Sequence, residues 1–204
     1  PGGNIQTTID LELQMYCEKL MADKKGVIIV GEPLTGGILA AISSPDYPPD
    51  FFTGLITESD WKKIKNNPDK PLINRYIQGT YIPGSIVKMI TQIALLNSHQ
   101  FNKETKQYCP GFYQFGDRIF GCWYTEGHGE LNVTEAMAAS CDVYFYKTVR
   151  NLDLEDLNKT FNKFGFGQKT KIDIPNEAVG LVPDNEYMRK RYGKYGWSRG
   201  VLLN

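Results

Sequence analysis

Residues 83–88, with the sequence PGSIVK, open the stretch that decides the fold. From Ser85 to Asn97 the apolar residues surround nearly the whole helical circumference, and a helix that is apolar on all sides is buried in a protein core. Lys88 is the only charged residue in this stretch. The sequence therefore predicts a largely buried central helix that starts at Ser85 and carries a lysine into the core.

The serine and the lysine of this helix are three positions apart, so their side chains are neighbours. Serine is a weak nucleophile until a base takes its proton, and a lysine can be that base because burial disfavours its charged form. Ser85 is accordingly a candidate nucleophile and Lys88 its base. The alternative is an N-cap serine beside a snorkelling lysine. A second Ser-x-x-Lys, from Ser59 to Lys62, lies in a polar segment in which the lysine stays solvated.

The segments on either side of residues 83–97 indicate an α+β protein. Strands are expected at 4–9, 26–30 and 38–42, the last two as a hairpin, and helices at 11–23, 59–65, 134–150 and 154–164. The apolar run 26–30 is typical of a central strand covered on both faces. Residues 108–129 are expected to be loop with short strands, and residues 190–196 a surface loop.

Composition and charge exclude several classes of protein. The chain has 204 residues, of which 41% are hydrophobic, and 23 basic side chains balance 23 acidic ones. This composition excludes disorder over most of the chain. Because there is no basic excess to follow a phosphate backbone, we expect no nucleic-acid partner. No run approaches 18 apolar residues, so the sequence predicts no membrane span within this chain.

A second motif, Ser140-Cys141-Asp142, follows Ser85 in the chain. Its serine can relay a proton, and its carboxylate can hold a lysine or a substrate amide. In this order, Ser-x-x-Lys and Ser-x-Asp resemble the signatures of the penicillin-binding protein transpeptidases, and the resemblance is closest to the elongation-specific members of class B. Further similar segments are residues 32–36, 41–47, 74–79, 128–129, 131–134, 164–167 and 172–175.

The resemblance implies a fold and an activity. The fold would be the penicillin-binding and serine β-lactamase-like one, with an antiparallel sheet sandwiched by helices. Ser85 would form an acyl-enzyme with peptidoglycan stem peptides and with β-lactams, and Lys88 would be the base. Ser140 would relay the proton, and Asp142 would position Lys88 and the substrate. This D,D-transpeptidase would need no catalytic cofactor.

The resemblance also implies partners and a location. RodA and MreC of the cell-elongation machinery would be partners, and the protein would act at the periplasmic face of the bacterial inner membrane. Two alternatives stay open: a β-lactamase or β-lactam sensor with the same motifs, and a non-catalytic scaffold module that binds morphogenesis partners.

The third signature of the family, Lys-Thr-Gly, is absent from the chain. Lys169-Thr170-Lys171 lacks the glycine and precedes residues 172–175, whereas the family's motif lies well downstream of that segment. We therefore expect residues 1–204 to form an incomplete transpeptidase domain. Its C-terminal part with the third-motif strand, the pedestal domain and the membrane anchor would lie outside this chain.

Three of the four cysteines are spaced with a histidine as Cys109-x12-Cys122-x5-His128-x12-Cys141. Three thiols and one imidazole make a closed tetrahedral zinc set, so we predict a structural zinc. The resemblance implies that some relatives carry Asp, another zinc ligand, at positions 109 and 122. The alternatives are a Cys109–Cys122 disulfide, or a loop histidine near unpaired thiols. Cys17 is expected to be a buried small hydrophobe.

Overall fold

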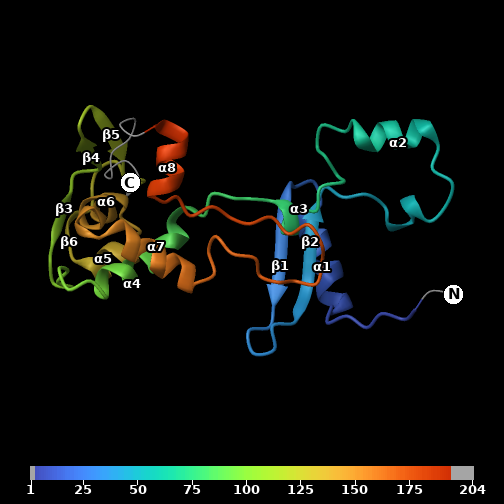
Figure 1. Cartoon of the computed structure of the whole chain (residues 1–204), viewed down its shortest axis with the longest axis horizontal. Helices are drawn as coiled ribbons and strands as arrows, with labels where there is room; N and C mark the ends of the chain where they lie inside the picture. Colours follow the sequence, from blue (N-terminus) through green and yellow to red (C-terminus); the bar gives the residue numbers. More distant parts are fainter. Residues whose placement is uncertain (1–2, 194–204) are drawn as a thin grey trace. The chain divides into compact units, whose positions relative to one another are not determined.

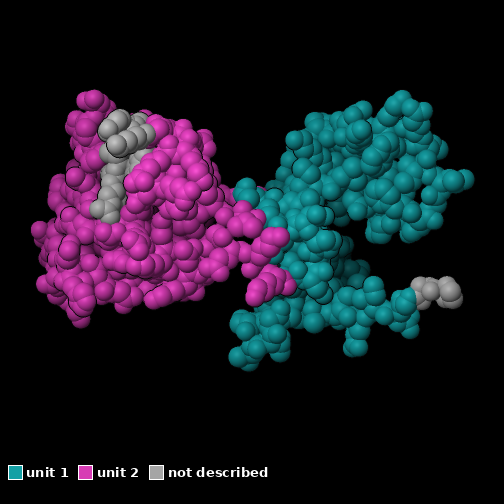
Figure 2. Space-filling model, viewed as in Figure 1, with its two compact units in different colours: residues 1–80, 172–178 teal, residues 81–171, 179–204 magenta. Residues whose placement is uncertain are grey.

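The computed structural model describes residues 3–193, which form two compact units (Figure 1). Unit 1 comprises residues 1–80 and 172–178, and unit 2 comprises residues 81–171 and 179–204 (Figure 2). No helix in the described part of the chain has both the length and the apolar character that a membrane crossing requires. The assignment of all 204 residues to one domain stays a prediction.

Unit 1 is built on a helix and a β-hairpin. The elements are α1 (Leu11–Met21), β1 (Gly26–Gly31) and β2 (Ile38–Ser44), and the two strands pair antiparallel as expected. Asp10 caps α1 by accepting a hydrogen bond from the N–H of Leu13. Cys17 is buried between α1 and the hairpin with Ala40 and Ile42, which confirms it as a small core residue.

Two strand predictions in unit 1 are corrected by the structure. Residues 4–9 form no strand: Thr8 Oγ1 donates to the carbonyl of Ile38, but the segment has no backbone ladder with β2. The second error concerns β1, which is not covered on both faces. In the described residues it pairs with β2 alone, and Ile29 is 51% exposed.

The rest of unit 1 is irregular and contains three short helices. These are a 3₁₀ turn at Pro49–Phe52, α2 (Glu58–Lys65) and α3 (Arg75–Gln78). The helix α2 confirms the polar helix expected at 59–65. Lys62 forms a solvent-exposed ion pair with Glu58, as expected for the second Ser-x-x-Lys copy.

Unit 2 combines short helices with two small sheets. Its helices are a 3₁₀ turn at Gly84–Val87, α4 (Lys88–Leu96), α5 (Val133–Ala138), α6 (Asp142–Thr148), a 3₁₀ turn at Val149–Asn151, α7 (Leu154–Lys163) and α8 (Asn185–Tyr192). β3 (Gln107–Cys109) pairs with β6 (Gly129–Leu131), and β4 (Phe112–Phe115) pairs with β5 (Arg118–Gly121). The α+β class and the antiparallel pairing are confirmed. The described strands form three two-stranded sheets, however, rather than one sheet between helices.

The central helix is less buried than the sequence indicates. A 3₁₀ turn carries Ser85, the α-helix begins at Lys88, and its buried residues are Lys88, Ile90, Ala94 and Leu95. The apolar residues Ile86, Met89, Ile93 and Leu96 are 38–63% exposed. Since α5, α6 and α7 pack against one side of α4, the opposite side is open in the described part of the chain.

The helix expected at 134–150 is interrupted. Its two parts, α5 and α6, are separated by Ala139, Ser140 and Cys141. Ser140 adopts a left-handed backbone (φ 48°), and the N–H of Cys141 bonds back to the carbonyl of Ala136. This is the hydrogen-bond pattern that ends an α-helix in a Schellman motif, so the break follows from the conformation of one residue.

Of two predictions for the last part of the described chain, one is confirmed and one is wrong. The helix expected at 154–164 is confirmed as α7 and ends before Gly165. Residues 190–192, expected in a loop, are the last turn of α8, which ends at Gly193. Residues 194–196 lie outside the described part.

Candidate functional site

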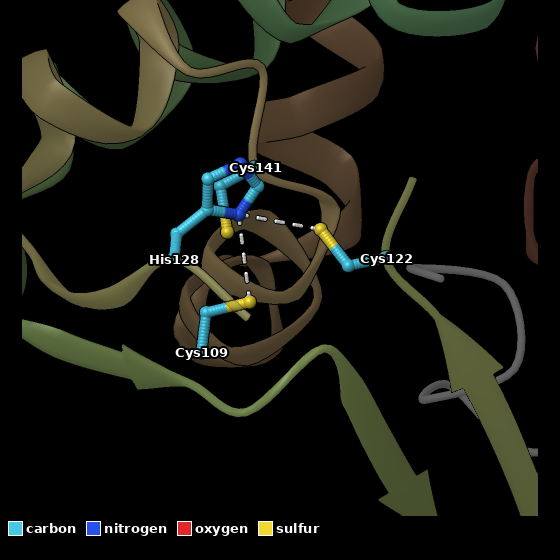
Figure 3. Close-up of side chains that lie close together, drawn as sticks. All are labelled: Cys109, Cys122, His128 and Cys141. Atoms are coloured by element: carbon cyan, nitrogen blue, oxygen red, sulfur yellow. Dashed lines mark hydrogen bonds between the residues drawn. The ribbon is translucent and has the colours of Figure 1, made fainter. Parts of the chain in front are cut away.

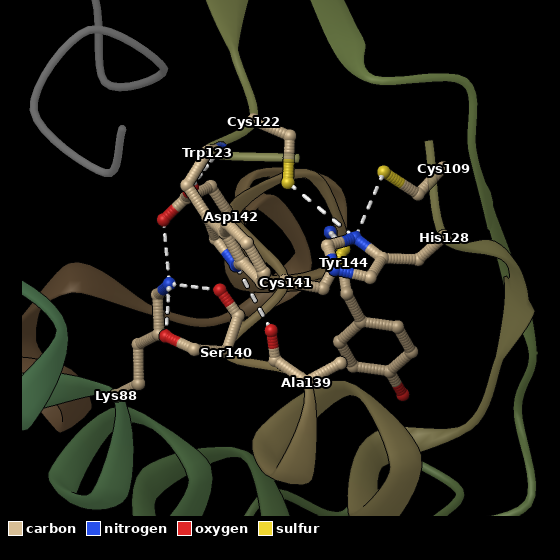
Figure 4. A network of polar contacts seen from close by, with 10 residues as sticks. All are labelled: Lys88, Cys109, Cys122, Trp123, His128, Ala139, Ser140, Cys141, Asp142 and Tyr144. Atoms are coloured by element: carbon tan, nitrogen blue, oxygen red, sulfur yellow. Dashed lines mark hydrogen bonds and ion pairs between the residues drawn. The ribbon is translucent and has the colours of Figure 1, made fainter. Parts of the chain in front are cut away.

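Lys88 is held by the turn between α5 and α6 (Figure 4). Its Nζ donates to the carbonyl of Ser140 at 2.7 Å, to Ser140 Oγ at 3.2 Å and to Asp142 Oδ1 at 2.5 Å. These three bonds use all the N–H donors of an ammonium group. The lysine and aspartate side chains are only 11% and 19% exposed. The structure thus brings together three of the four candidate catalytic residues across more than 50 positions of sequence.

Ser85, the fourth candidate, is exposed at the mouth of the same site. It lines a cavity of about 590 Å³ together with Lys88 and Asp142. In a 3₁₀ turn the side chains at i and i+3 lie on the same side, which places the serine and the lysine on one wall. Neither the 3₁₀ turn nor α4 is capped by a side chain. The N-cap interpretation of Ser85 is therefore wrong.

The walls of the cavity are mainly apolar. They are formed from α6, α7 and the segment before α8 by Phe145, Tyr146, Leu154, Leu157, Phe161, Phe166, Leu181, Val182 and Pro183. Asn158 Nδ2 donates to the carbonyl of Pro183, which ties that segment to α7. Burial, and then the Asp142 carboxylate, raise the pKa of Tyr146, so this phenol stays neutral beside the site. The cavity offers polar groups at one end and an apolar surface for a ligand elsewhere.

Ser140 is presented to Lys88 by a strained backbone. Its φ of 48° lies in the left-handed region, where a β-carbon is disfavoured. In this conformation the carbonyl and the hydroxyl of the same residue both accept from the lysine. Strain of this kind costs about 1–3 kcal/mol and is typical of functional sites.

Trp123 is a residue of the site that no sequence motif indicated. Its backbone N–H donates to Asp142 Oδ2 at 3.0 Å, and its indole Nε1 donates to the carbonyl of Ala139 at 2.9 Å (Figure 4). The carboxylate of Asp142 is thus held between Trp123 and Lys88. The one signal in the sequence is that Trp123 directly follows Cys122, a candidate metal ligand.

The candidate metal ligands form a second cluster beside this turn (Figure 3). The ligand atoms of Cys109, Cys122, His128 and Cys141 all lie within 4.8 Å of one another. His128 Nδ1 is 3.7 Å from Cys109 Sγ and 3.6 Å from Cys122 Sγ. The cysteines of the described residues are all free thiols, so the Cys109–Cys122 disulfide does not form here.

The thiols of this cluster differ in acidity. Burial raises the pKa of Cys109, but hydrogen bonds with the backbone and ring of His128 lower it more, and the result is about 7. Burial raises the pKa of Cys141 to about 12, and the neighbouring Cys109 and Cys122 contribute to the increase. The Cys109 thiol is therefore the more acidic of these two, and the Cys141 thiol stays protonated near neutral pH.

Ser85 and the buried Lys88 line one cavity, and Lys88 is hydrogen-bonded to the Ser-x-Asp turn. Together these features define a site of the penicillin-recognising serine class. The family model described as "penicillin binding protein transpeptidase domain" matches residues 26–203 of the chain. The chain belongs to the penicillin-binding protein transpeptidase family. Transpeptidases of this family need no catalytic cofactor.

Individual relatives agree with this assignment. The peptidoglycan D,D-transpeptidase MrdA of Escherichia coli (strain K12) is 36% identical over 204 residues, which are 99% of this chain and 32% of that protein. The complex between penicillin-binding protein 2 (PBP2) and MreC from Helicobacter pylori contains a chain with TM-score 0.89 and 38% identity, covering 96% of this chain and 37% of that one. The penicillin G acyl-enzyme of penicillin-binding protein A from Mycobacterium tuberculosis gives TM-score 0.80 and 25% identity, covering 97% and 48%. The chain spans about a third of the length of the curated relatives.

Proposed function

We propose that this chain carries the nucleophile and base of a peptidoglycan D,D-transpeptidase of the cell-elongation machinery. The observation that carries the proposal is that buried Lys88 is bound by Ser140 and Asp142 on the same cavity as Ser85. The M. tuberculosis relative with a penicillin G acyl-enzyme supports the same chemistry.

In this mechanism the Ser85 hydroxyl attacks the carbonyl of the penultimate D-Ala of a stem peptide. Lys88 takes the hydroxyl proton. For this step it must first give up one of the three protons with which it binds Ser140 and Asp142, because the charged form has no lone pair. Ser140 returns a proton to the leaving D-Ala, and Asp142 holds Lys88 in place. The amine of a second stem peptide then takes the acyl group from Ser85 and forms the cross-link. A β-lactam acylates the same oxygen when its ring opens.

The first test is covalent labelling with a fluorescent penicillin. In the full-length protein we expect stoichiometric, slowly released label that Ser85→Ala abolishes. Ser59→Ala is the matched control, since it removes the serine of the second Ser-x-x-Lys and should label like the wild type. Failure of the wild type to label would contradict the proposal. Rapid turnover of the label would favour the β-lactamase interpretation instead.

We propose MreC and RodA as partners, at the periplasmic face of the bacterial inner membrane. Support for MreC comes from the H. pylori complex of PBP2 with MreC. A structurally similar chain comes from a peptidoglycan synthase complex that couples polymerization and crosslinking, which supports a polymerase partner such as RodA. Co-purification of each partner with the full-length protein tests these contacts. Failure of MreC or RodA to co-purify would contradict the proposed contact with that partner.

We also propose that Cys109, Cys122, His128 and Cys141 hold a structural zinc. Tetrahedral zinc with ordinary bond lengths separates a sulfur from a nitrogen ligand by about 3.6 Å. The two sulfur to Nδ1 distances, 3.7 and 3.6 Å, fit that edge. A bound zinc would stabilise the thiolates and brace the turn that contains Ser140 and Asp142, without taking part in acyl transfer.

Metal analysis tests the zinc proposal. We expect about one zinc per chain, lost in Cys122→Ser but retained in Cys17→Ser, which alters a buried cysteine outside the cluster. The zinc-free variant should also melt at a lower temperature than the control. Metal-free wild-type protein with a mapped Cys109–Cys122 disulfide would contradict the proposal.

A further inference from the structure

Trp123 lies between the metal-ligand cluster and the turn that holds Lys88 (Figure 4). The residue is 64% exposed, yet both of its N–H groups have protein acceptors. An exposed indole could donate to water instead, so these two internal bonds need an explanation. Both acceptors, the Ala139 carbonyl and the Asp142 carboxylate, belong to the turn between α5 and α6.

The two bonds hold the two ends of that turn. Ala139 is the C-cap of α5, at the helix end where carbonyls lack helical partners, and Asp142 is the first residue of α6. Between them lies Ser140 in its left-handed conformation. Trp123 therefore bridges the short segment that supplies every hydrogen-bond acceptor of Lys88.

We propose that Trp123 is a positioning residue for acyl transfer, which fixes the Ala139–Asp142 turn and thereby the place of Lys88 Nζ relative to Ser85. The inference rests on the proposed function. Trp123 is not among the residues that line the cavity, so it acts through Asp142 and Ser140 rather than by touching substrate.

The hydrogen bonds at the two ends of the turn give the physical reason. The indole Nε1–H of Trp123 fixes the Ala139 carbonyl at one end, which only a tryptophan at this position can do. At the other end, Asp142 Oδ1 accepts from Lys88 while Oδ2 accepts from the backbone N–H of Trp123, which fixes the rotation of the carboxylate. Because Lys88 donates all its protons to this turn, a shift of the turn moves the base. A displacement of about 1 Å costs up to about a hundredfold in rate, even when the substrate contacts are unchanged.

Two variants of neighbouring rings separate this role from simple packing. Trp123→Phe keeps the backbone N–H that donates to Asp142, and it keeps a ring against His128, whose centroid lies 5.4 Å from that of the indole. It removes only the indole donor to the Ala139 carbonyl. Tyr124→Phe is the matched control. Tyr124 packs on the same His128 ring at 5.2 Å, and its hydroxyl has no hydrogen-bond partner within the described part of the chain.

The experiment measures acylation of the full-length protein by a fluorescent penicillin in stopped flow, which separates non-covalent binding from the acylation step. We expect Trp123→Phe to slow the acylation step tenfold or more, with the dissociation constant of the non-covalent complex changed less than twofold. Tyr124→Phe should leave both values within twofold of wild type. Zinc content and melting temperature should be equal in all three proteins.

An acylation step within twofold of wild type in Trp123→Phe would overturn the inference, as would an equal effect of Tyr124→Phe. If Trp123→Phe does not fold, 3-benzothienylalanine at position 123 decides the question, because it keeps the shape of the indole and lacks its N–H. Wild-type acylation rates for that protein would refute the inference, and a slowed step would support it. If wild-type protein is not acylated on Ser85, the proposed function itself has failed.

Discussion

At the scale of single residues, Ser140 combines a strained backbone with a polar side chain that Lys88 uses. Replacement by Gly relieves the left-handed strain, whereas replacement by Ala keeps the β-carbon and the strain. Both variants lose the hydroxyl. We expect Ser140→Gly to be more stable than Ser140→Ala by about 1 kcal/mol, measured as the free energy of unfolding in urea.

The same pair of variants tests the chemistry of Ser140. If the hydroxyl relays a proton, both should acylate with penicillin about a hundredfold more slowly than wild type. Equal stabilities of the two variants would contradict the strain argument. Wild-type acylation by either variant would contradict the relay.

Arg75 is the most heavily bonded side chain of unit 1. Its guanidinium donates to the backbone carbonyls of Pro45, Asp69, Lys70 and Ile73. A lysine has three donors on a single nitrogen and cannot span these acceptors. We expect Arg75→Lys to lower the free energy of unfolding by about 2 kcal/mol.

The matched control for Arg75 is Arg118→Lys, on the exposed β5 strand. Within the described residues, the side chain of Arg118 makes no hydrogen bond or ion pair, so its replacement should change stability by less than about 0.5 kcal/mol. Urea unfolding of both variants provides the comparison. Equal losses would show that the four carbonyl contacts do not stabilise unit 1.

At the scale of elements, the loop that carries the cysteines closes through two glycines. A β-carbon at Gly127 would lie 2.4 Å from the carbonyl oxygen of Cys109, and one at Gly111 would lie 2.0 Å from that of Thr125. Both glycines have positive φ. Close backbone contact at these positions is what brings Cys109 and His128 together.

Gly127→Ala should therefore disrupt the loop, with a loss of about 3 kcal/mol and of the zinc that we propose for this cluster. Gly116→Ala is the control, because Gly116 also has positive φ but has open space around it. That variant should lose about 1 kcal/mol and keep its metal. Thermal unfolding and metal analysis measure both effects, and zinc retention in Gly127→Ala would contradict the prediction.

Helices defined by local signals were predicted well, whereas their environment was not. The Asp10 cap and α7 match the sequence, because caps and periodicity act over a few residues. The break at Ser140 was missed, since a serine in the left-handed conformation carries no sequence signal. The exposure of α4 was missed as well, because periodicity shows that a helix is apolar but not which neighbours cover it.

At the scale of the whole molecule, charge is balanced and lies almost entirely at the surface. Lys88–Asp142 is the ion pair with both side chains mostly buried. In eight other ion pairs of the described residues, both partners are at least 40% exposed. Exposed pairs contribute about 0–1 kcal/mol each, so we expect stability to depend on one pair far more than on the rest.

Two helix-starting carboxylates test this expectation. Asp142 and Glu155 lie in the first turns of α6 and α7, and each pairs with a lysine. Asp142→Asn leaves a buried charge without its counter-ion and should cost about 3 kcal/mol in the free energy of unfolding. Glu155→Gln should cost less than about 0.5 kcal/mol. Similar losses in both variants would contradict the distinction between buried and exposed pairs.

The α+β class, the hairpin, the pairing of Ser85 with Lys88 and the family could all be inferred from the sequence, because each rests on residues close in the chain or on their order. The sequence also led us to expect that Asp142 positions Lys88 and that three thiols and an imidazole converge. The tertiary structure supplied the geometry of these contacts, and it added the bonds of Trp123, which no sequence pattern indicated. These contacts connect positions far apart in the chain. Their geometry is set by packing and turn conformation rather than by local propensity, which is why the sequence pattern could name the residues but not their arrangement.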